Sequence, residues 1–294
     1  MNQYGLSRHI PADTALQVRQ RSRFGCVVCR CAIYQYEHID PEFANARTHD
    51  PEKICLLCGG CHDRVTRGRL SKETIKSKYA EIQVAQDVDA PFEELDLACN
   101  DISVVLGTAT FHHAKSLIRI DGQDLLSITP PSDGAAFPTL NGVFCDRFGS
   151  VIFRVIDNVW QGSTDAWDIE IVGSNVTIRA EEHRPALSFD IIPPRTIQVR
   201  TLDMYINNCH IVCDEKQLLV GQTFGSKGAY IGLGNFTCSG AIAGISVDSR
   251  TRTTPIPTGI SIAGGQGVSI DGTGISVGVG AGSMLIAEMK VWVA

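Results

Sequence analysis

The chain has 294 residues, of which 44% are hydrophobic and 20% charged, so it is long enough for two ordinary domains and is neither disordered nor fibrous as a whole. It contains no run of eighteen apolar residues and no secretory signal, so we expect no membrane span and a cytoplasmic protein. The net charge of −6 is unevenly divided: residues 1–80 carry 13 Lys/Arg against 8 Asp/Glu, while the remainder is acidic. A basic first segment favours contact with phosphate groups.

The first predicted element is a helix over residues 11–21, with a proline at its start and arginines towards its end. Six cysteines follow within 36 residues, a density that suits a metal site better than a disulfide framework. Two CxxC knuckles separated by 28 residues can present four thiolates to one structural zinc ion: Cys26, Cys29, Cys58 and Cys61. Cys31 and Cys55 lie outside this spacing and are expected to be packing residues.

Three further motifs lie between and beside the knuckles: Tyr36–Pro41 (YEHIDP), Thr48–Cys58 (THDPEKICLLC) and the pair Cys61-His62. In this order and spacing they resemble the HNH, or ββα-metal, nuclease family in its zinc-ribbon branch. The resemblance covers roughly residues 20–75. It implies a ββα-metal module, stiffened by the four-cysteine zinc ribbon, that hydrolyses phosphodiester bonds.

By this resemblance, Glu37 and His62 would bind a catalytic divalent ion (Mg²⁺, Mn²⁺, Ni²⁺ or Zn²⁺), and His38 would be the general base. Phosphodiester cleavage requires a base to activate water and a cation to offset the developing charge. A histidine suits the first role because its ordinary pKa lies near neutrality.

The chain departs from the family pattern at Lys53, which stands where an asparagine usually precedes the leucine-rich strand. That asparagine normally braces the loop that bears the catalytic histidine, so the departure concerns activity rather than fold. Three residues can replace the brace, and the first of them can instead be an additional metal ligand: His49, Asp50 and Asn45.

Four basic residues follow the second knuckle: Arg64, Arg67, Arg69 and Lys72. They lie where a substrate backbone would run, so we expect them to bind nucleic acid, with double-stranded DNA as the favoured form. The alternative is an ordinary solvated helix face. No base-reading motif accompanies them, which predicts weak sequence preference.

A second helix is predicted over residues 70–86, with Ser71 as its N-cap and Ile75, Tyr79 and Ile82 on one stripe. The acidic, proline-containing stretch after it marks a domain boundary. We therefore expect an α+β chain with an HNH domain over 1–88 and a larger all-β domain over 98–294, either a sandwich or solenoid-like.

Apolar and polar residues alternate clearly at 150–160 and 168–180, as expected of strands. Cys209, Ile211 and Cys213 would share one strand face, which indicates core rather than a metal site. Within residues 240–294 a unit of Gly-aliphatic-Ser-aliphatic recurs at 244, 259, 267 and 274. The recurrence suggests stacked short strands, or ordinary glycine-rich strands of a sandwich, and we expect a homo-oligomer that covers their edges.

The favoured function is a metal-dependent HNH endonuclease, of the kind found in bacterial or phage defence, whose β domain senses a small-molecule or protein trigger or assembles the protein. Two alternatives stay open. One is a zinc-ribbon nucleic-acid-binding protein without catalysis, and the other is a structural β assembly with an accessory HNH module.

Overall fold

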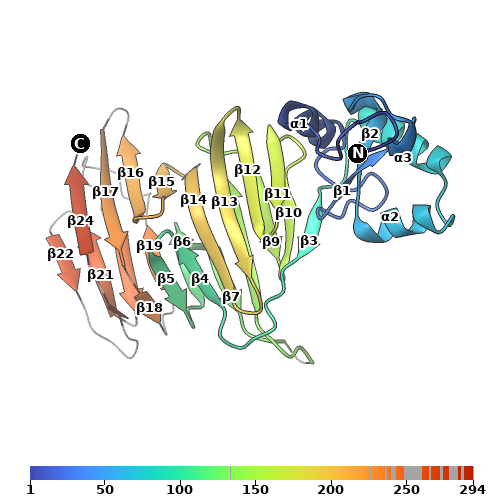
Figure 1. The fold of residues 1–294 in the computed structure, drawn as a ribbon. Helices are drawn as coiled ribbons and strands as arrows, with labels where there is room; N and C mark the ends of the chain where they lie inside the picture. Colours follow the sequence, from blue (N-terminus) through green and yellow to red (C-terminus); the bar gives the residue numbers. More distant parts are fainter. Residues whose placement is uncertain are drawn as a thin grey trace. The chain divides into compact units, whose positions relative to one another are not determined.

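The computed structural model describes residues 1–132, 134–224, 227–235, 237–239, 243–247, 260–264, 266–271, 274–277, 284–285 and 288–293. Both helices and strands occur, and strands predominate (Figure 1). The chain divides into two compact units, called here unit 1 (Met1–Glu93 and Gln161–Ile171) and unit 2 (Glu94–Trp160 and Val172–Ala294). None of the helices in the described part of the chain combines the length and apolar character needed to cross a membrane.

Unit 1 is built from three helices, two short 3-10 turns and a two-stranded antiparallel sheet of β1 and β2. In chain order its elements are α1 (Ala12–Arg21), β1 (Gln35–His38), η1 (Phe43–Asn45), η2 (Pro51–Lys53), β2 (Ile54–Leu57), α2 (Gly59–Thr66), α3 (Lys72–Val84) and β3 (Phe92–Glu94).

Both predicted helices are confirmed, and local chemistry explains their ends. Helix α1 begins directly after Pro11, and helix α3 begins after Ser71, whose hydroxyl accepts a hydrogen bond from the Thr74 amide. The stripe expected on α3 is buried and contributes Ile75, Tyr79 and Ile82 to the core of unit 1. A two-stranded sheet alone would be marginal, so this stripe supplies apolar cover that the hairpin needs.

Residues 161–171 belong to unit 1 although they lie far from it in sequence. The sequence pattern had placed this segment within the predicted β domain of residues 98–294. Its attachment to α1 depends on Arg19 and Asp168, which form a bidentate ion pair with two N···O distances of 2.8 Å. Both side chains are almost fully buried, and the Arg19 guanidinium also donates to the Tyr36 hydroxyl at 3.0 Å. Sequence carries no signal for a pair separated by 149 positions.

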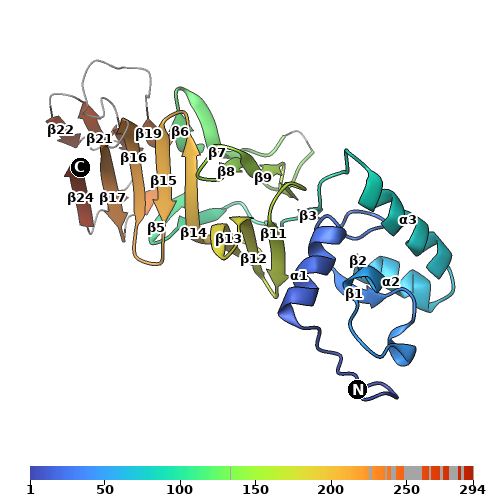
Figure 2. The same ribbon diagram turned by 90° about the horizontal axis from the view of Figure 1, so that it is seen from above.

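Unit 2 contains two sheets, which can be followed in Figure 1 and, from above, in Figure 2. Apart from its last strand, β3, the first runs in the order β22-β21-β20-β19-β6-β7-β8-β9-β10. Its strands are β6 (Ser116–Ile120), β7 (Gln123–Thr129), β8 (Thr139–Cys145), β9 (Val151–Ile156), β10 (Val159–Gly162), β19 (Ala243–Val247), β20 (Ile260–Gly264), β21 (Gln266–Asp271) and β22 (Gly274–Val277).

The second sheet runs in the order β23-β18-β5-β4-β14-β15-β16-β17-β24, and β12 and β13 adjoin it beside β14. Its strands are β4 (Ser103–Leu106), β5 (Ala109–His112), β12 (Asn175–Glu181), β13 (Arg184–Ile192), β14 (Thr196–Ile206), β15 (Cys209–Cys213), β16 (Leu218–Phe224), β17 (Lys227–Gly234), β18 (Thr237–Ser239), β23 (Met284–Leu285) and β24 (Glu288–Val293). Strand β11 (Asp168–Val172) lies where the chain returns to unit 2.

The two sheets pack face to face through apolar side chains. Phe153 on β9 and Phe189 on β13 have ring centroids 5.1 Å apart, and Trp160 lies against Phe153. Cys209, Ile211 and Cys213 are buried, which confirms the prediction that this stretch is core. The alternation at 150–160 is interrupted between β9 and β10 by Asp157 and Asn158, both at positive φ, so one expected strand is two.

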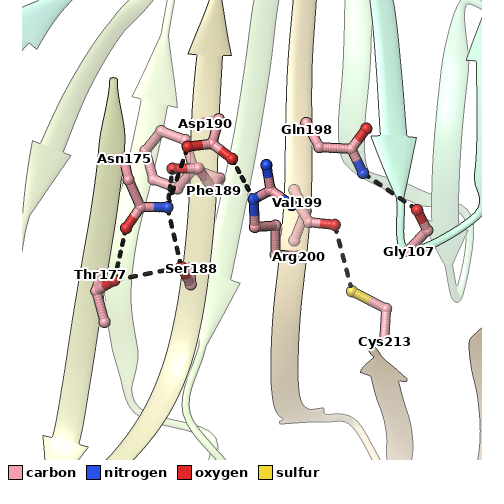
Figure 3. Close-up of polar contacts among 10 residues, drawn as sticks. All are labelled: Gly107, Asn175, Thr177, Ser188, Phe189, Asp190, Gln198, Val199, Arg200 and Cys213. Atoms are coloured by element: carbon pink, nitrogen blue, oxygen red, sulfur yellow. Dashed lines mark hydrogen bonds and ion pairs between the residues drawn. The ribbon is translucent and has the colours of Figure 1, made fainter. Parts of the chain in front are cut away.

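The opposite face of β12 and β13 in the second sheet is polar and internally hydrogen-bonded. Figure 3 shows Asn175, Thr177, Ser188 and Asp190 turned towards one another on β12 and β13. The Asn175 amide donates to Ser188 and Asp190, at 3.3 and 3.2 Å, and its oxygen accepts from Thr177 at 2.9 Å. Arg200 on β14 pairs with Asp190. The strands were predicted from alternating apolar and polar residues, and in this network the polar side chains of that alternation are hydrogen-bonded to one another.

The four copies of the Gly-aliphatic-Ser-aliphatic unit lie in four neighbouring antiparallel strands, β19 to β22. Their register places the serines opposite one another in succession: Ser246 with Ser261, Ser261 with Ser269, and Ser269 with Ser276. The aliphatic positions pair in the same way. Gly259 and much of the remaining 240–294 region lie outside the described residues, and the homo-oligomer stays a prediction.

We predict that Asp168→Ala destabilises unit 1 by about 3–5 kcal/mol, because it removes the bidentate partner of the buried Arg19 guanidinium and leaves it only the longer carboxylate contact with Glu170, at 3.7 Å. Urea denaturation of the full chain measures the change. Glu52→Ala is the matched control. Glu52 is the exposed partner of Arg21, which lies on α1 as Arg19 does, and its removal should cost less than about 1 kcal/mol. Equal effects of the two substitutions would contradict the role given to Asp168.

Candidate metal centre and adjoining histidine site

The site is built on β1, β2 and α2, which follow one another in unit 1. The two strands pair antiparallel over four residues, with Glu37 opposite Cys55 and His38 opposite Ile54. Strand β1 ends at His38, and helix α2 begins immediately after Cys58. All of β2 is buried, so the hairpin presents its chemistry on β1 and on α2.

The sulfur atoms of Cys26, Cys29, Cys58 and Cys61 form one cluster, all within 4.8 Å of one another. The Cys29 sulfur lies 3.5 Å from that of Cys58 and 3.8 Å from that of Cys61. Tetrahedral coordination with zinc–sulfur bonds of about 2.3 Å places the sulfurs about 3.8 Å apart. The cluster therefore has the donors and spacing to hold a metal ion, and zinc fits both.

The thiols of this cluster differ in acidity. Burial raises the pKa of Cys29 to about 11, and burial also raises the pKa of Cys61. For Cys58, burial alone would raise the pKa, but hydrogen bonds from the Cys61 amide and the neighbouring thiols outweigh it and lower the pKa. Closely packed thiols resist joint ionisation, and a divalent cation removes that resistance by binding thiolates directly.

Arg30, which sequence analysis did not single out, organises the first knuckle. It is buried at positive φ, and its guanidinium donates to the carbonyls of Ser22 and Asp89, at 3.0 and 2.9 Å. Its amide donates to the Cys26 carbonyl at 2.9 Å. These bonds hold the turn that brings Cys26 and Cys29 to the cluster, whereas Cys31 points elsewhere and donates to Glu93.

Glu37 and His62, the residues suggested for a divalent ion, lie side by side. Glu37 Oε2 is 3.2 Å from His62 Nε2. His62 follows Cys61 on α2, so the cysteine cluster fixes its position, and the Glu37 side chain is 15% exposed. The other carboxylate oxygen, Glu37 Oε1, is taken by the ammonium group of Lys72.

His38 is buried and held by a second histidine. Its Nε2 lies 3.2 Å from Nδ1 of His49, and Nε2 of His49 lies 3.0 Å from the carbonyl oxygen of Ser7. A carbonyl accepts hydrogen bonds, so His49 donates through Nε2, and in the tautomer with its proton on Nε2 the acceptor is Nδ1. His38 consequently donates through Nε2, which leaves its Nδ1 as the basic atom. Burial lowers the pKa of His38, and His49 lowers it further.

Of the three residues considered as the loop brace, the structure brings His49 to His38. Asn45 is exposed and accepts a hydrogen bond from Gln3 at 2.8 Å. Asp50 caps η2 through the Glu52 amide and lies 3.4 Å from the Lys53 ammonium. Lys53 supports the loop through its backbone, because its carbonyl accepts the Ile39 amide at 2.8 Å.

The amino-terminal residues and Phe43 complete the support for the histidine pair, and sequence analysis missed both. Asn2 donates to the carbonyls of Phe43 and Ala46, each at 2.6 Å. The Phe43 ring lies 5.3 Å from the His38 ring and stacks with His49 at 6.4 Å. An aromatic residue five positions after a histidine is too common a pattern to have identified this contact.

His38 lines a cavity of about 210 Å³ together with Arg47, Asp50 and Lys53. Its lining includes neither Glu37 nor His62. His38 and Glu37 are thus neighbours on β1, but of the base and ligand candidates only His38 lines this cavity. Its wall carries two cationic side chains and the carboxylate of Asp50, which lies 3.4 Å from the Lys53 ammonium, so a net positive charge remains that favours an anionic group.

The basic residues after the second knuckle divide into two groups. Arg64, Arg67 and Arg69 are exposed, and Arg67 pairs with Asp63 at 2.8 Å. Lys72 instead turns inwards to Glu37 and the His38 carbonyl. All three arginines of the first group lie on the surface of unit 1.

Comparison of the chain with protein-family models, with curated proteins and with solved structures finds no match.

We predict that the purified chain binds one zinc ion and that Cys29→Ser releases it, because a hydroxyl does not replace a thiolate in a four-sulfur cage. Elemental analysis of the protein after gel filtration measures the content. Cys31→Ser is the matched control two residues away and should retain the metal. Stoichiometric zinc in Cys29→Ser would contradict the assignment.

Proposed function

We propose that residues 20–75 form an HNH nuclease module of the zinc-ribbon type and that the chain is a metal-dependent endonuclease acting on DNA. The observation that carries the proposal is the 3.2 Å contact between Glu37 and His62, with His38 following Glu37 directly and held by His49. The order β1, β2, α2 with a four-cysteine cluster is the arrangement that the resemblance implies.

Glu37 and His62 fit a hard divalent ion as a carboxylate and imidazole pair that already converges. When bound there, such an ion would supply positive charge beside the scissile phosphate. The residues of the chain hold the two ligands in place. The zinc-binding cluster fixes His62, and the pairing of β1 with β2 fixes Glu37, so neither ligand needs to be ordered at the moment of binding.

His38 acts as the general base in this proposal. The chain of hydrogen bonds from His38 through His49 to the Ser7 carbonyl directs the lone pair of His38 to Nδ1. The lowered pKa keeps the ring neutral at physiological pH, the state that can accept a proton from water. His49 thereby takes over the bracing role that Lys53 cannot fill.

The substrate assignment rests on charge. The exposed residues Arg64, Arg67 and Arg69 follow the metal-ligand candidate His62 along the chain, and Arg47 and Lys53 line the cavity beside His38. A basic surface without a base-reading element favours contact with the sugar-phosphate backbone, and hence weak sequence preference. A trigger-sensing or assembling role for unit 2 belongs to this proposal as an accompanying function.

One observation favours a second candidate, a zinc-ribbon protein that binds nucleic acid without cutting it. The Lys72 ammonium occupies one oxygen of Glu37, and the cavity beside His38 does not include the ligand pair. Strong, salt-dependent DNA binding with no cleavage under Mg²⁺, Mn²⁺ or Ni²⁺ would select this candidate.

We predict that His38→Ala lowers the rate of plasmid cleavage by about 10²–10⁴-fold, the usual contribution of a general base. The assay uses zinc-loaded protein with Mg²⁺, Mn²⁺ or Ni²⁺. His183→Ala, which removes an exposed histidine of unit 2, is the control and should cleave as the parent does. A parent activity that survives unchanged in His38→Ala would refute the role of His38.

We also predict that His49→Ala lowers kcat by about 10²-fold and leaves KM nearly unchanged, because it misorients the base without touching the substrate surface. Steady-state cleavage of a labelled duplex separates the two constants. Calorimetric Mn²⁺ affinity should match that of the parent. A marked loss of Mn²⁺ binding would instead make His49 a metal ligand.

A further inference from the structure

Lys72 is the one predicted nucleic-acid contact that the structure turns away from the surface. It is the first residue of α3, directly after the capping residue Ser71, so the start of its side chain is fixed. The side chain is 19% exposed. Its ammonium donates to Glu37 Oε1 and, at 2.9 Å, to the carbonyl oxygen of His38.

The Glu37 carboxylate is therefore shared between two partners. Lys72 lies on Oε1 and His62 lies on Oε2, at 3.2 Å. The two oxygens carry one delocalised negative charge, and the ammonium already offsets much of it. A divalent cation joining Glu37 and His62 would face a fixed positive charge across a single carboxylate, and screening by water is weak where both side chains are largely buried.

We propose that Lys72 is an internal counter-cation that positions Glu37 and weakens binding of the divalent ion until a phosphodiester adds its own negative charge. The inference rests on the proposed function, because it concerns the same ligand pair. Lys72 also holds the His38 carbonyl, so one ammonium group fixes the ligand and the backbone of the general base together. It is a positioning residue.

The test is the affinity for Mn²⁺ of the zinc-loaded full chain, measured by isothermal titration calorimetry without nucleic acid. Lys72→Met removes the charge, and Lys72→Gln removes the charge but keeps a hydrogen-bond donor. Both should bind Mn²⁺ at least tenfold more tightly than the parent. Lys76→Met is the matched control, because Lys76 lies one turn further along α3 and pairs with the exposed Asp40. It should leave the affinity unchanged.

A second set of titrations contains a saturating DNA duplex and uses the His38→Ala background to prevent cleavage. DNA should increase the Mn²⁺ affinity more in the protein that keeps Lys72 than in Lys72→Met. The difference in Mn²⁺ affinity between the two proteins should therefore be smaller with DNA than without it. An equal effect of DNA on the two proteins would overturn the dependence on phosphate.

Unchanged or weaker Mn²⁺ binding in both Lys72 variants would overturn the proposal, and so would loss of folding in both, which would make Lys72 a structural residue. The underlying site is tested separately with His62→Ala. If that variant and the parent bind Mn²⁺ identically, the ligand pair itself is refuted and the proposed function fails, whatever Lys72 does.

Discussion

The packing of four cysteine sulfurs within 4.8 Å of one another is the constraint on which unit 1 depends. It ties two segments separated by 28 residues, in a unit whose sheet pairs over four residues per strand. Cys58 is the first residue after β2, and Cys61 immediately precedes His62. The distance between His62 and β1 therefore follows from the cluster, and the contact of His62 with Glu37 is its chemical consequence. A metal ion in the cluster would stabilise fold and site together.

Two short chains of hydrogen bonds converge on the end of β1 and hold its last two residues, Glu37 and His38. One runs from the Ser7 carbonyl through His49 to His38, and the other from Lys72 to Glu37 and the His38 carbonyl. Both come from residues distant in sequence, and both satisfy polar groups with little access to water. Because each of these two neighbouring residues has its own partners, contacts within unit 1 fix their relative orientation.

Sequence alone predicted what depends on spacing and periodicity. The CxxC pairs indicated the cysteine cluster, Ser71 and the apolar stripe indicated α3, and the serine recurrence indicated neighbouring strands. The sequence did not predict which partner a side chain contacts when several candidates are distant from it along the chain. Nothing in a single sequence distinguishes an exposed Lys72 from one turned inwards, or selects His49 over Asp50 and Asn45. The turn at Asp157 and Asn158 was missed for another reason, because a residue pair suited to positive φ stood inside an apparently continuous alternation.

The return of residues 161–171 to unit 1 has a consequence for how the gene can be divided. A fragment that stops near residue 93 keeps every cysteine of the cluster and every histidine of the site, yet it lacks the carboxylate that receives the Arg19 guanidinium. The first unit is thus not a cassette that can be cut off or transplanted at one junction. Replacing unit 1 by the corresponding unit of another chain would need two further junctions, one on each side of the returning segment.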